Sequence, residues 1–442
     1  MSLLCLLAAV ALVSRVPFLN AGYGLHWDAW GNAKIAQAIA QTGTYTMARV
    51  PGAPIYEIAL AFLCRGGPIA LNALSAVAGA AATTVFALLA RRLGCRDWFL
   101  AAGALAFSAV FFVSCVTTKD FAVAFFFIVL SAYFVASGRS IAAGAALGLA
   151  IGCRLTSGVA LLPLALMLFH STTDRRLRAT VYFACAAGAV AVTAFIPAFV
   201  RYGTTFLRYY EPIYYPRWQV VVTRGTVDVW GLFGCLGLVI ALAAALLYRK
   251  RPRSLVTAPT LVRVSWGAIV LLYIALYVAF PDQAAYLLPA VPFTILLLGA
   301  AAPRWAFQAC CVLCAFGSVV GWQKGRLVAG PIFADHADRV RMMANVRNFY
   351  DYSRTVPGKN VFVIGGYYHA IELIAPESRA GHYVYLLKRE ELARFRGDGY
   401  TIYYLPAIRG FELDVNGVDL AANGAHDLVA YRNAADAARG AR

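Results

Sequence analysis

The sequence predicts a polytopic α-helical membrane protein with a small α/β domain at its C-terminal end. Of the 442 residues, 61% are hydrophobic and 14% are charged, and the mean hydropathy is +0.67. Apolar runs long enough to cross a bilayer recur through residues 1–322. Shorter segments with the spacing of strands and amphipathic helices follow from residue 323. This composition lies far from that of soluble globular domains.

Eleven apolar segments are expected to cross the membrane. They lie at 1–19, 68–90, 98–117, 121–137, 141–152, 156–169, 179–199, 227–248, 264–280, 284–302 and 305–322. Residues 1–19 are interpreted as a retained first helix, because they lack the basic start and the small-residue cleavage site of a signal peptide. The predicted organisation is therefore a transmembrane domain at 1–322 and a soluble domain at 323–442.

Basic residues in alternate connections set the predicted orientation. They are Arg91, Arg92, Arg96, Arg139, Arg175, Arg176, Arg178, the 249–253 run and Arg304. The positive-inside rule makes their side cytoplasmic, so the N-terminus is expected inside and the loops 20–67 and 200–226 and the C-terminal domain outside. The formal net charge of +18 is not gathered on one soluble face with interleaved aromatic residues, so no nucleic-acid partner is expected.

The segment 141–169 tests this topology, because arginines bound it at both ends. As one helix it would be about 43 Å long at ~1.5 Å per residue, which exceeds a hydrocarbon core of ~30 Å. Two cytoplasmic ends require an even number of crossings, so we expect a hairpin of two short helices with Arg154 at its tip. The alternative is one tilted helix with Arg154 buried and paired, which would reverse every later loop.

Further elements are predicted outside the membrane. In the loop 20–67, Ile35 and Ile39 repeat at helical spacing, which predicts an interfacial helix ended by Gly43. The C-terminal domain is expected to contain helices at 335–352, 367–374 and 389–396 and strands at 360–364, 400–405 and 427–431. The Gly365–Gly366 pair lacks the full spacing of a dinucleotide-binding loop, so it is interpreted as a plain turn.

Ionisable side chains at membrane edges are the candidate site residues, since such groups are costly unless they are paired or functional. Asp28 and Asp120 are the candidate catalytic acids. The candidate substrate-binding residues are Arg49, Glu57, Lys119, Arg154, Arg201, Arg208 and Tyr286. A carboxylate can accept the proton of an attacking hydroxyl, while cations stabilise a departing phosphate. This division of labour fits glycosyl transfer from a lipid-linked phosphate.

Each candidate also has a structural alternative. Asp28 is placed to cap the helix that begins near Trp30, where an acid is favourable. The pair Lys119–Asp120 can neutralise itself at the start of the span at 121. The tyrosines and arginines of the loop 200–226 match an aromatic belt at the headgroups.

Several segments of the chain resemble GT-C glycosyltransferases, the group that holds protein O-mannosyltransferases and the lipid A aminoarabinose transferase. They are Ser14–Leu19, Trp27–Trp30, Gly43–Tyr45, Arg49–Pro54, Thr118–Asp120, Ala143–Ala150, Arg154–Thr156, Leu162–Leu164 and Tyr286–Pro292. The resemblance covers residues 1–300 and implies that Asp28 is a catalytic base or a metal-linked acid. It also implies that Arg49 lies near the donor phosphate. Protein mannosyltransferases carry a second acid where Ala29 stands here, which argues against protein mannosylation.

We therefore expect an inverting transferase of the bacterial cytoplasmic (inner) membrane that uses a polyprenyl-phosphate-linked sugar donor. The acceptor is a lipid, a glycan or a protein on the extracytoplasmic side. Asp28 is expected to share an outward-facing pocket with Arg154. A divalent metal ion, Mg or Mn, is an open option, with Asp28 and Asp120 as its ligands.

Two other classes of protein remain open at the level of sequence. The first is a transporter or flippase for lipids or lipid-linked sugars, which would be expected to show inverted repeats with broken helices in both halves. No such self-similarity is evident in the sequence. The second is a noncatalytic assembly or receptor protein whose C-terminal domain does the binding.

Overall fold

The computed structural model describes residues 2–171, 176–207, 215–248, 256, 258–374, 383–408, 412–413 and 416–428. The chain forms two compact units. The bundle unit comprises Met1–Tyr23 and Ile35–His336, and the C-terminal unit comprises Gly24–Lys34 and Ala337–Arg442. The division falls after His336 instead of residue 322, because Ile332 and His336 still pack against Phe18 of the bundle unit.

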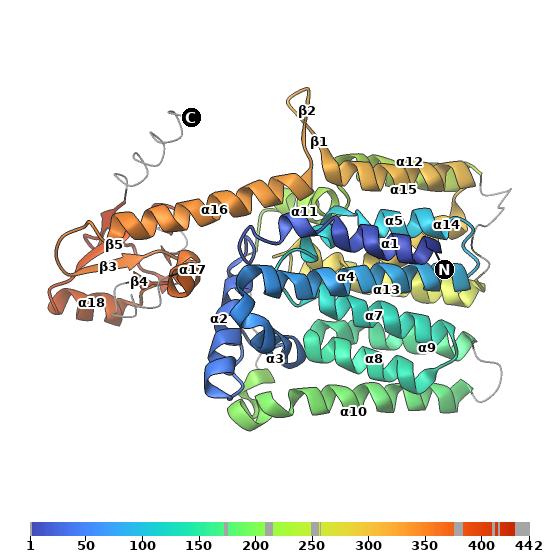
Figure 1. Ribbon diagram of the computed structural model, residues 1–442, viewed down its shortest axis with the longest axis horizontal. Coiled ribbons are helices and arrows are strands. Elements are labelled where there is room, and N and C mark those ends of the chain that lie inside the picture. The colour runs from blue at the N-terminus through green and yellow to red at the C-terminus, as the bar shows by residue number, and fades with distance from the viewer. Residues whose placement is uncertain are drawn as a thin grey trace. The chain divides into compact units, whose positions relative to one another are not determined.

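The bundle unit is almost entirely helical (Figure 1). Its helices are α1 (Ser2–Val13), α3 (Pro54–Leu63), α4 (Gly67–Arg92), α5 (Trp98–Ala106), α6 (Ala109–Ser114), α7 (Phe121–Ala136), α8 (Ser140–Cys153), α9 (Leu161–Ser171), α10 (Arg176–Tyr202), α11 (Trp218–Trp230), α12 (Leu232–Leu247), α13 (Thr260–Ala279), α14 (Ala290–Ala301) and α15 (Arg304–Val319). Short 3₁₀ turns lie at Val16–Phe18, Cys64–Gly66, Leu155–Ala160, Gly203–Leu207 and Ala284–Leu287. Helix α2 (Trp27–Thr42) begins in the C-terminal unit and ends in the bundle unit.

Every one of the predicted apolar segments contains a helix, so their helical character is confirmed. Within the described residues, three stretches are both long and apolar enough to cross a membrane: Pro54–Arg92, Arg176–Leu207 and Thr260–Ala279. The pair α11 and α12 counts as a fourth if its 87° bend belongs to one span. The other apolar helices are shorter.

Three features differ from the sequence prediction. The segment 98–117 is divided into α5 and α6, with Ser108 in an extended conformation between them. The chain bends at Gly231, between α11 and α12. This glycine has a φ of 72°, and an added Cβ would clash with the carbonyl oxygen of Gly317. Helix α3 lies within the segment that was predicted as an outer loop. The sequence prediction missed this helix because Glu57 interrupts its apolar sequence.

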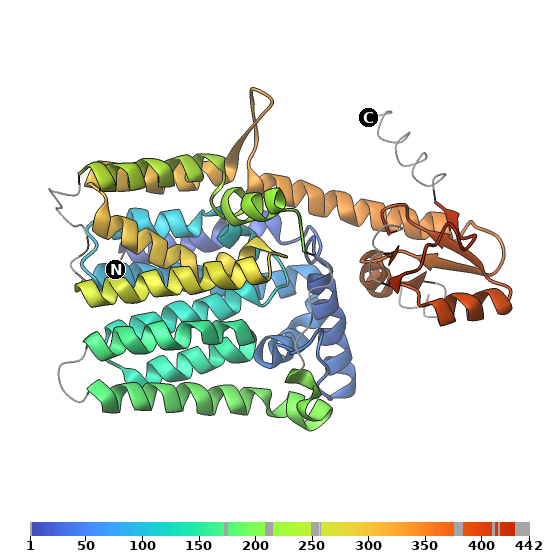
Figure 2. The same ribbon diagram turned by 180° about the vertical axis from the view of Figure 1, so that it is seen from behind.

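The segment 141–169 is two helices, as the length argument predicts. Arg154 has φ −160° and ψ 112°, an extended residue that ends α8 before the turn leading into α9. Helix α8 packs closely on α10 because Gly144, Gly148 and Gly152 leave room for the α10 backbone. A Cβ at Gly148 would lie 2.7 Å from the carbonyl oxygen of Ala187. Figures 1 and 2 show α7, α8, α9 and α10 side by side.

Charged residues lie at both ends of the bundle. At one end, Arg92 donates from Nε to the carbonyl oxygen of Ala136 at 2.7 Å, and Arg304 pairs with Asp97 at 2.8 Å. Asp120 precedes α7 at the end opposite Ala136. Arg92 and Arg304, two of the basic residues in the alternate connections, therefore lie at the end opposite Asp120.

The C-terminal unit contains a four-stranded parallel sheet of order β4-β3-β5-β6. Its elements are α16 (Pro331–Ser353), which starts in the bundle unit, β3 (Asn360–Val363), α17 (Tyr367–Ile374), β4 (Tyr383–Val384), α18 (Arg389–Gly397), β5 (Thr401–Tyr404) and β6 (His426–Asp427). The α/β prediction is confirmed for each predicted helix and for strands β3 and β5. Residues 429–431 of the last predicted strand lie outside the described residues, and the short strand β4 was not predicted.

The remaining strands form a hairpin in the bundle unit. Strands β1 (Val320–Gln323) and β2 (Arg326–Ala329) pair antiparallel. The two-residue turn between them has Lys324 and Gly325 at φ 49° and 79°, the positive values that a tight hairpin turn requires.

Candidate functional site

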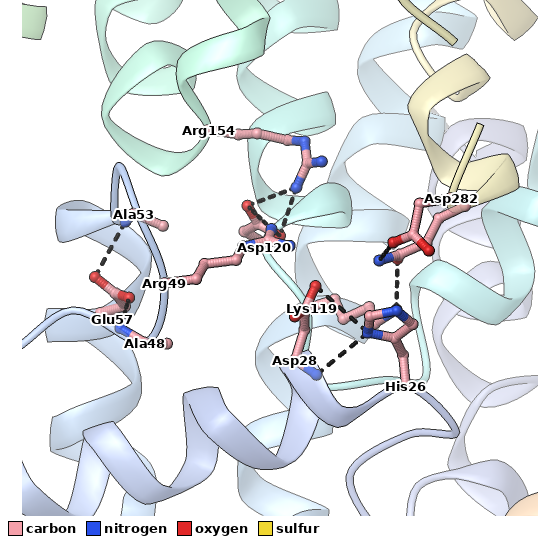
Figure 3. A network of polar contacts seen from close by, with 11 residues as sticks. His26, Asp28, Ala48, Arg49, Ala53, Glu57, Lys119, Asp120, Arg154 and Asp282 are labelled. Carbon is pink, nitrogen blue, oxygen red and sulfur yellow. Dashed lines mark hydrogen bonds and ion pairs between the residues drawn. The ribbon is translucent and has the colours of Figure 1, made fainter. Parts of the chain in front are cut away.

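The carboxylate of Asp120 lies between two guanidinium groups at one end of the bundle (Figure 3). Arg154 donates from Nη1 to both carboxylate oxygens at 3.0 and 2.8 Å, and Arg49 donates from Nη2 to both at 3.3 Å. The side chains of Asp120 and Arg154 are only 6% and 9% exposed, while that of Arg49 is 35% exposed. The Asp120 cluster, made of these three residues, thus joins segments that are far apart in sequence.

Arg154 is also held by aromatic rings. Its guanidinium carbon lies 3.7 Å from the ring centre of Phe121 and 4.6 Å from that of Tyr286, and these two rings meet edge to face at 5.7 Å. Such cation–π contacts fix the plane of the guanidinium and are stronger where water is excluded. Tyr286, a predicted substrate-binding residue, therefore contacts Arg154.

The loop that carries Arg49 is organised by Glu57. This carboxylate, on a residue that is 1% exposed, accepts hydrogen bonds from the Tyr45 hydroxyl at 2.6 Å, the Ala48 amide at 2.8 Å and the Ala53 amide at 3.0 Å. Because both amides flank Arg49 in sequence, Glu57 fixes the path of the backbone that presents this arginine.

Lys119 and Asp120 are adjacent in sequence but have different partners. Its ammonium donates to the side-chain oxygen of Gln283 at 2.6 Å, and the amide of Gln283 donates to Asp282 at 3.1 Å. Since Asp120 takes its ion pairs from two arginines, the prediction that Lys119–Asp120 is a self-neutralising pair does not describe this arrangement.

Asn72 connects the loop before Asp120 to the end of the first segment. This fully buried side chain donates to the carbonyl oxygens of Leu19 and Gly22 at 2.9 Å, and it accepts from the Thr118 hydroxyl at 2.7 Å. The Thr118 amide donates to the carbonyl oxygen of Tyr23 at 2.8 Å. The backbone that leads into Asp120 is thereby held at several points.

Asp28 lies in the first turn of α2, within the part of the chain that groups with the C-terminal unit. Its carboxylate is 3.5 Å from Nδ1 of His26 and 12% exposed, and its amide donates to the same nitrogen at 3.3 Å. An acid at this position is favourable for the helix, so the predicted capping role and a catalytic role are both compatible with its location.

A cavity of 990 Å³ lies apart from the Asp120 cluster residues, at the ends of α2, α3 and α10. Its walls are largely apolar, with Ile39, Ile58, Phe62 and Val200 among the lining residues, and Arg65 and Arg201 also line it. Arg201 thus lies in a groove of mixed apolar and cationic character. Arg208 lies outside the described residues.

The donor set around Asp120 does not suit a divalent cation, because a metal would have to displace the guanidinium groups that already occupy its oxygens. Within the described residues, no three His, Cys, Asp or Glu side chains are grouped so as to hold a metal ion. The option of Mg or Mn with Asp28 and Asp120 as ligands stays a prediction.

The helical bundle carries acids and arginines at one end, and a small α/β unit follows it in the chain. Two crystal structures of ArnT from Cupriavidus metallidurans share the fold of this chain. The structure bound to undecaprenyl phosphate has a TM-score of 0.54 and 12% identity over 97% of this chain and 90% of that one. The apo structure has a TM-score of 0.52 and 14% identity over 97% and 89%. No protein-family model matches the sequence, and comparison with curated proteins gave no match.

Sequence reasoning identified the charged residues of the Asp120 cluster but not their partners. Asn72, Tyr45 and Arg65 were missed because single polar residues in apolar or loop sequence carry no periodic signal. A buried Asn in a long apolar helix is the one sign that was available, since such a residue is costly unless it is hydrogen-bonded.

Proposed function

We propose that this protein is a GT-C-type glycosyltransferase of the bacterial inner membrane that uses a polyprenyl-phosphate-linked sugar as donor. The observation that carries the proposal is the Asp120 cluster, which places two guanidinium groups at one end of a bundle that shares its fold with an undecaprenyl-phosphate-bound protein. Guanidinium groups match phosphate geometry and stabilise its charge.

In the proposed reaction, an acceptor hydroxyl attacks the anomeric carbon of the donor sugar as Asp28 accepts the hydroxyl proton. The bond from that carbon to the phosphate oxygen breaks, and the electron pair leaves with the polyprenyl phosphate. A single displacement from the opposite face inverts the anomeric configuration.

The arginines have distinct roles in this proposal. Arg49, the more exposed of the two, contacts the phosphate, and its guanidinium offsets the charge that grows on the leaving oxygen. Arg154, more deeply buried, adds a second positive charge behind it. Asp120 holds both groups in orientation, and Glu57 holds the loop that carries Arg49.

The groove lined by Arg65 and Arg201 fits a lipid phosphate with its chain. Apolar walls suit an acyl or prenyl chain, while the two cations suit its phosphate. We assign Arg201 to lipid binding on this basis.

We further propose that the chain crosses the membrane eleven times, with the N-terminus inside and the C-terminal unit outside. Helices of 12 to 16 residues, such as α14 and α15, span roughly 18–24 Å at ~1.5 Å per residue. Flanking turns extend several of them, as Leu155–Ala160 extends α9. Short crossings of this kind are accommodated by local thinning of the bilayer.

The test uses the full-length protein in nanodiscs with radiolabelled polyprenyl-phosphate sugars, and it measures release of free polyprenyl phosphate. Asp28→Asn should abolish release while thermal unfolding stays near that of the wild type. Asp351→Asn, at an exposed acid of the C-terminal unit, is the matched control and should retain turnover. Full turnover by Asp28→Asn removes this residue from the mechanism. Movement of the intact donor between leaflets without release would instead identify a flippase.

A further inference from the structure

The start of α2 belongs with the C-terminal α/β domain, although more than 300 residues of sequence separate them. Lys34 and Glu372 form an ion pair with an Nζ–Oε2 distance of 2.5 Å. The ammonium also lies 5.3 Å from the ring centre of Tyr368, one turn before Glu372 on α17. Lys34 of α2 thus contacts both the Glu372 carboxylate and the Tyr368 ring on one face of α17.

A second contact holds the other end of the same segment. The indole of Trp27 meets the ring of Tyr385 edge to face at 6.1 Å. It also covers the turn between β3 and α17, since an added Cβ at Gly366 would lie 3.3 Å from Cε3 of Trp27. The indole nitrogen of Trp30 donates to the carbonyl oxygen of Gly24 at 2.8 Å, which closes the segment on itself.

Asp28 lies between these two attachment points. It follows Trp27 directly and precedes Lys34 by less than two helical turns. Because a helix is stiff over this length, contacts at both points fix the direction in which the Asp28 carboxylate projects.

We propose that the C-terminal unit fixes the position of residues 24–34, the segment that carries Asp28. Lys34 and Glu372 are positioning residues for sugar transfer. The inference rests on the proposed role of Asp28 as the base. It assigns the C-terminal unit a part in the reaction without any contact to the substrate.

The side chains of Lys34 and Glu372 are 38% and 25% exposed, so their ion pair contributes little to global stability. Its effect is expected on geometry. A reacting group displaced by about 1 Å can lower the rate by up to ~10²-fold, and partial loosening should lower it by roughly 5- to 20-fold. Donor binding by the arginines of the bundle unit should be unaffected.

The experiment compares Lys34→Met, Glu372→Gln and the exchanged pair Lys34→Glu/Glu372→Lys in the full chain. Glu390→Gln, at an exposed acid on α18, is the matched control. The readouts are kcat, KM for the lipid-linked donor, and hydrogen–deuterium exchange of residues 24–34. The single variants should lower kcat about 5- to 20-fold with KM within about twofold, and exchange of 24–34 should become faster. The exchanged pair should recover at least half of the lost activity and protection, while the control stays at the wild-type values.

Each outcome separates this inference from the proposed function. Wild-type kcat in the single variants, with Asp28→Asn inactive, overturns the positioning role and leaves the transferase standing. An exchanged pair no better than the single variants also overturns it. If Asp28→Asn is active, the transferase mechanism is wrong, and the exchange of residues 24–34 alone then decides whether the domain holds this segment.

Discussion

Asp120 and Arg154 are expected to be strongly coupled in their contribution to stability. Each is the principal partner of the other, and both side chains are less than one-tenth exposed. We consider Asp120→Asn, Arg154→Met and the double variant. Asp120→Asn preserves shape but leaves two guanidinium groups facing a neutral amide. Arg154→Met leaves the carboxylate with Arg49 alone, at 3.3 Å.

The magnitude follows from burial. Removing one partner of a buried ion pair costs about 3–5 kcal/mol, since the remaining charge stays buried. Arg154→Met should cost about 3 kcal/mol because Arg49 still pairs with Asp120, and Asp120→Asn should cost about 4 kcal/mol. The double variant leaves only the more exposed Arg49, which can turn to solvent, so it should cost about 4 kcal/mol instead of the sum of about 7. The coupling free energy is therefore about 3 kcal/mol.

The assay is reversible unfolding in mixed detergent micelles containing increasing SDS, followed by far-UV circular dichroism. Arg49→Met is the control and should cost no more than about 1 kcal/mol, as expected for a partly exposed pair. If the double variant equals the sum of the two single variants within about 0.5 kcal/mol, the two side chains are independent and the account of the Asp120 cluster is refuted.

Three further predictions concern the supports of the site. Glu57→Gln should cost about 2–4 kcal/mol of stability and lower turnover, because its amide group places a donor next to backbone donors and leaves them one acceptor oxygen to share. Tyr45→Phe, which removes one of the three hydrogen-bond partners of Glu57, should cost less. Equal unfolding midpoints for the wild type and both variants would contradict this. Burial and then Lys34 lower the pKa of His369 below its usual value, so this neutral side chain contributes stability that is present above about pH 6.5 and lost as the pH falls through the lower folded pKa. The midpoint temperature of thermal unfolding should therefore fall more steeply between pH 7.5 and 5.5 for the wild type than for His369→Gln. Parallel curves for the two proteins would exclude the effect. Arg65→Met/Arg201→Met should raise KM for the lipid-linked donor or acceptor several-fold with little change in kcat, which initial-rate kinetics at varied lipid would show; unchanged KM for both lipids would remove the groove from binding.

Much of the fold could be predicted because its signals are local. Apolar runs gave a helix at every predicted segment, and the break at Arg154 followed from comparing the length of 141–169 with the bilayer thickness. The α/β pattern after residue 323 was equally readable, since strand and helix periodicity can be recognised within a few residues. The same reasoning missed α3, because one buried acid made its sequence look like an exposed loop.

The candidate site was predicted only in part. The charges at Arg49, Asp120 and Arg154 drew attention because ionisable groups beside apolar runs are rare and costly. Their pairing was not foreseen, and neither were the contacts of Glu57 with the loop that carries Arg49 and of Tyr286 with Arg154. A sequence shows that a charge needs a partner but does not show which of several distant groups will meet it.

The sequence by itself determined that this chain is a bundle of apolar helices with charged residues at its ends, because hydrophobic length and periodicity are properties of contiguous residues. Only the tertiary structure decided that Asp120 lies between Arg49 and Arg154, that Asn72 holds the preceding loop, and that Lys34 reaches Glu372. These contacts join residues between 34 and 338 positions apart. They depend on how whole helices pack against one another, and the free energy of that packing is shared among many residues instead of being carried by any one segment.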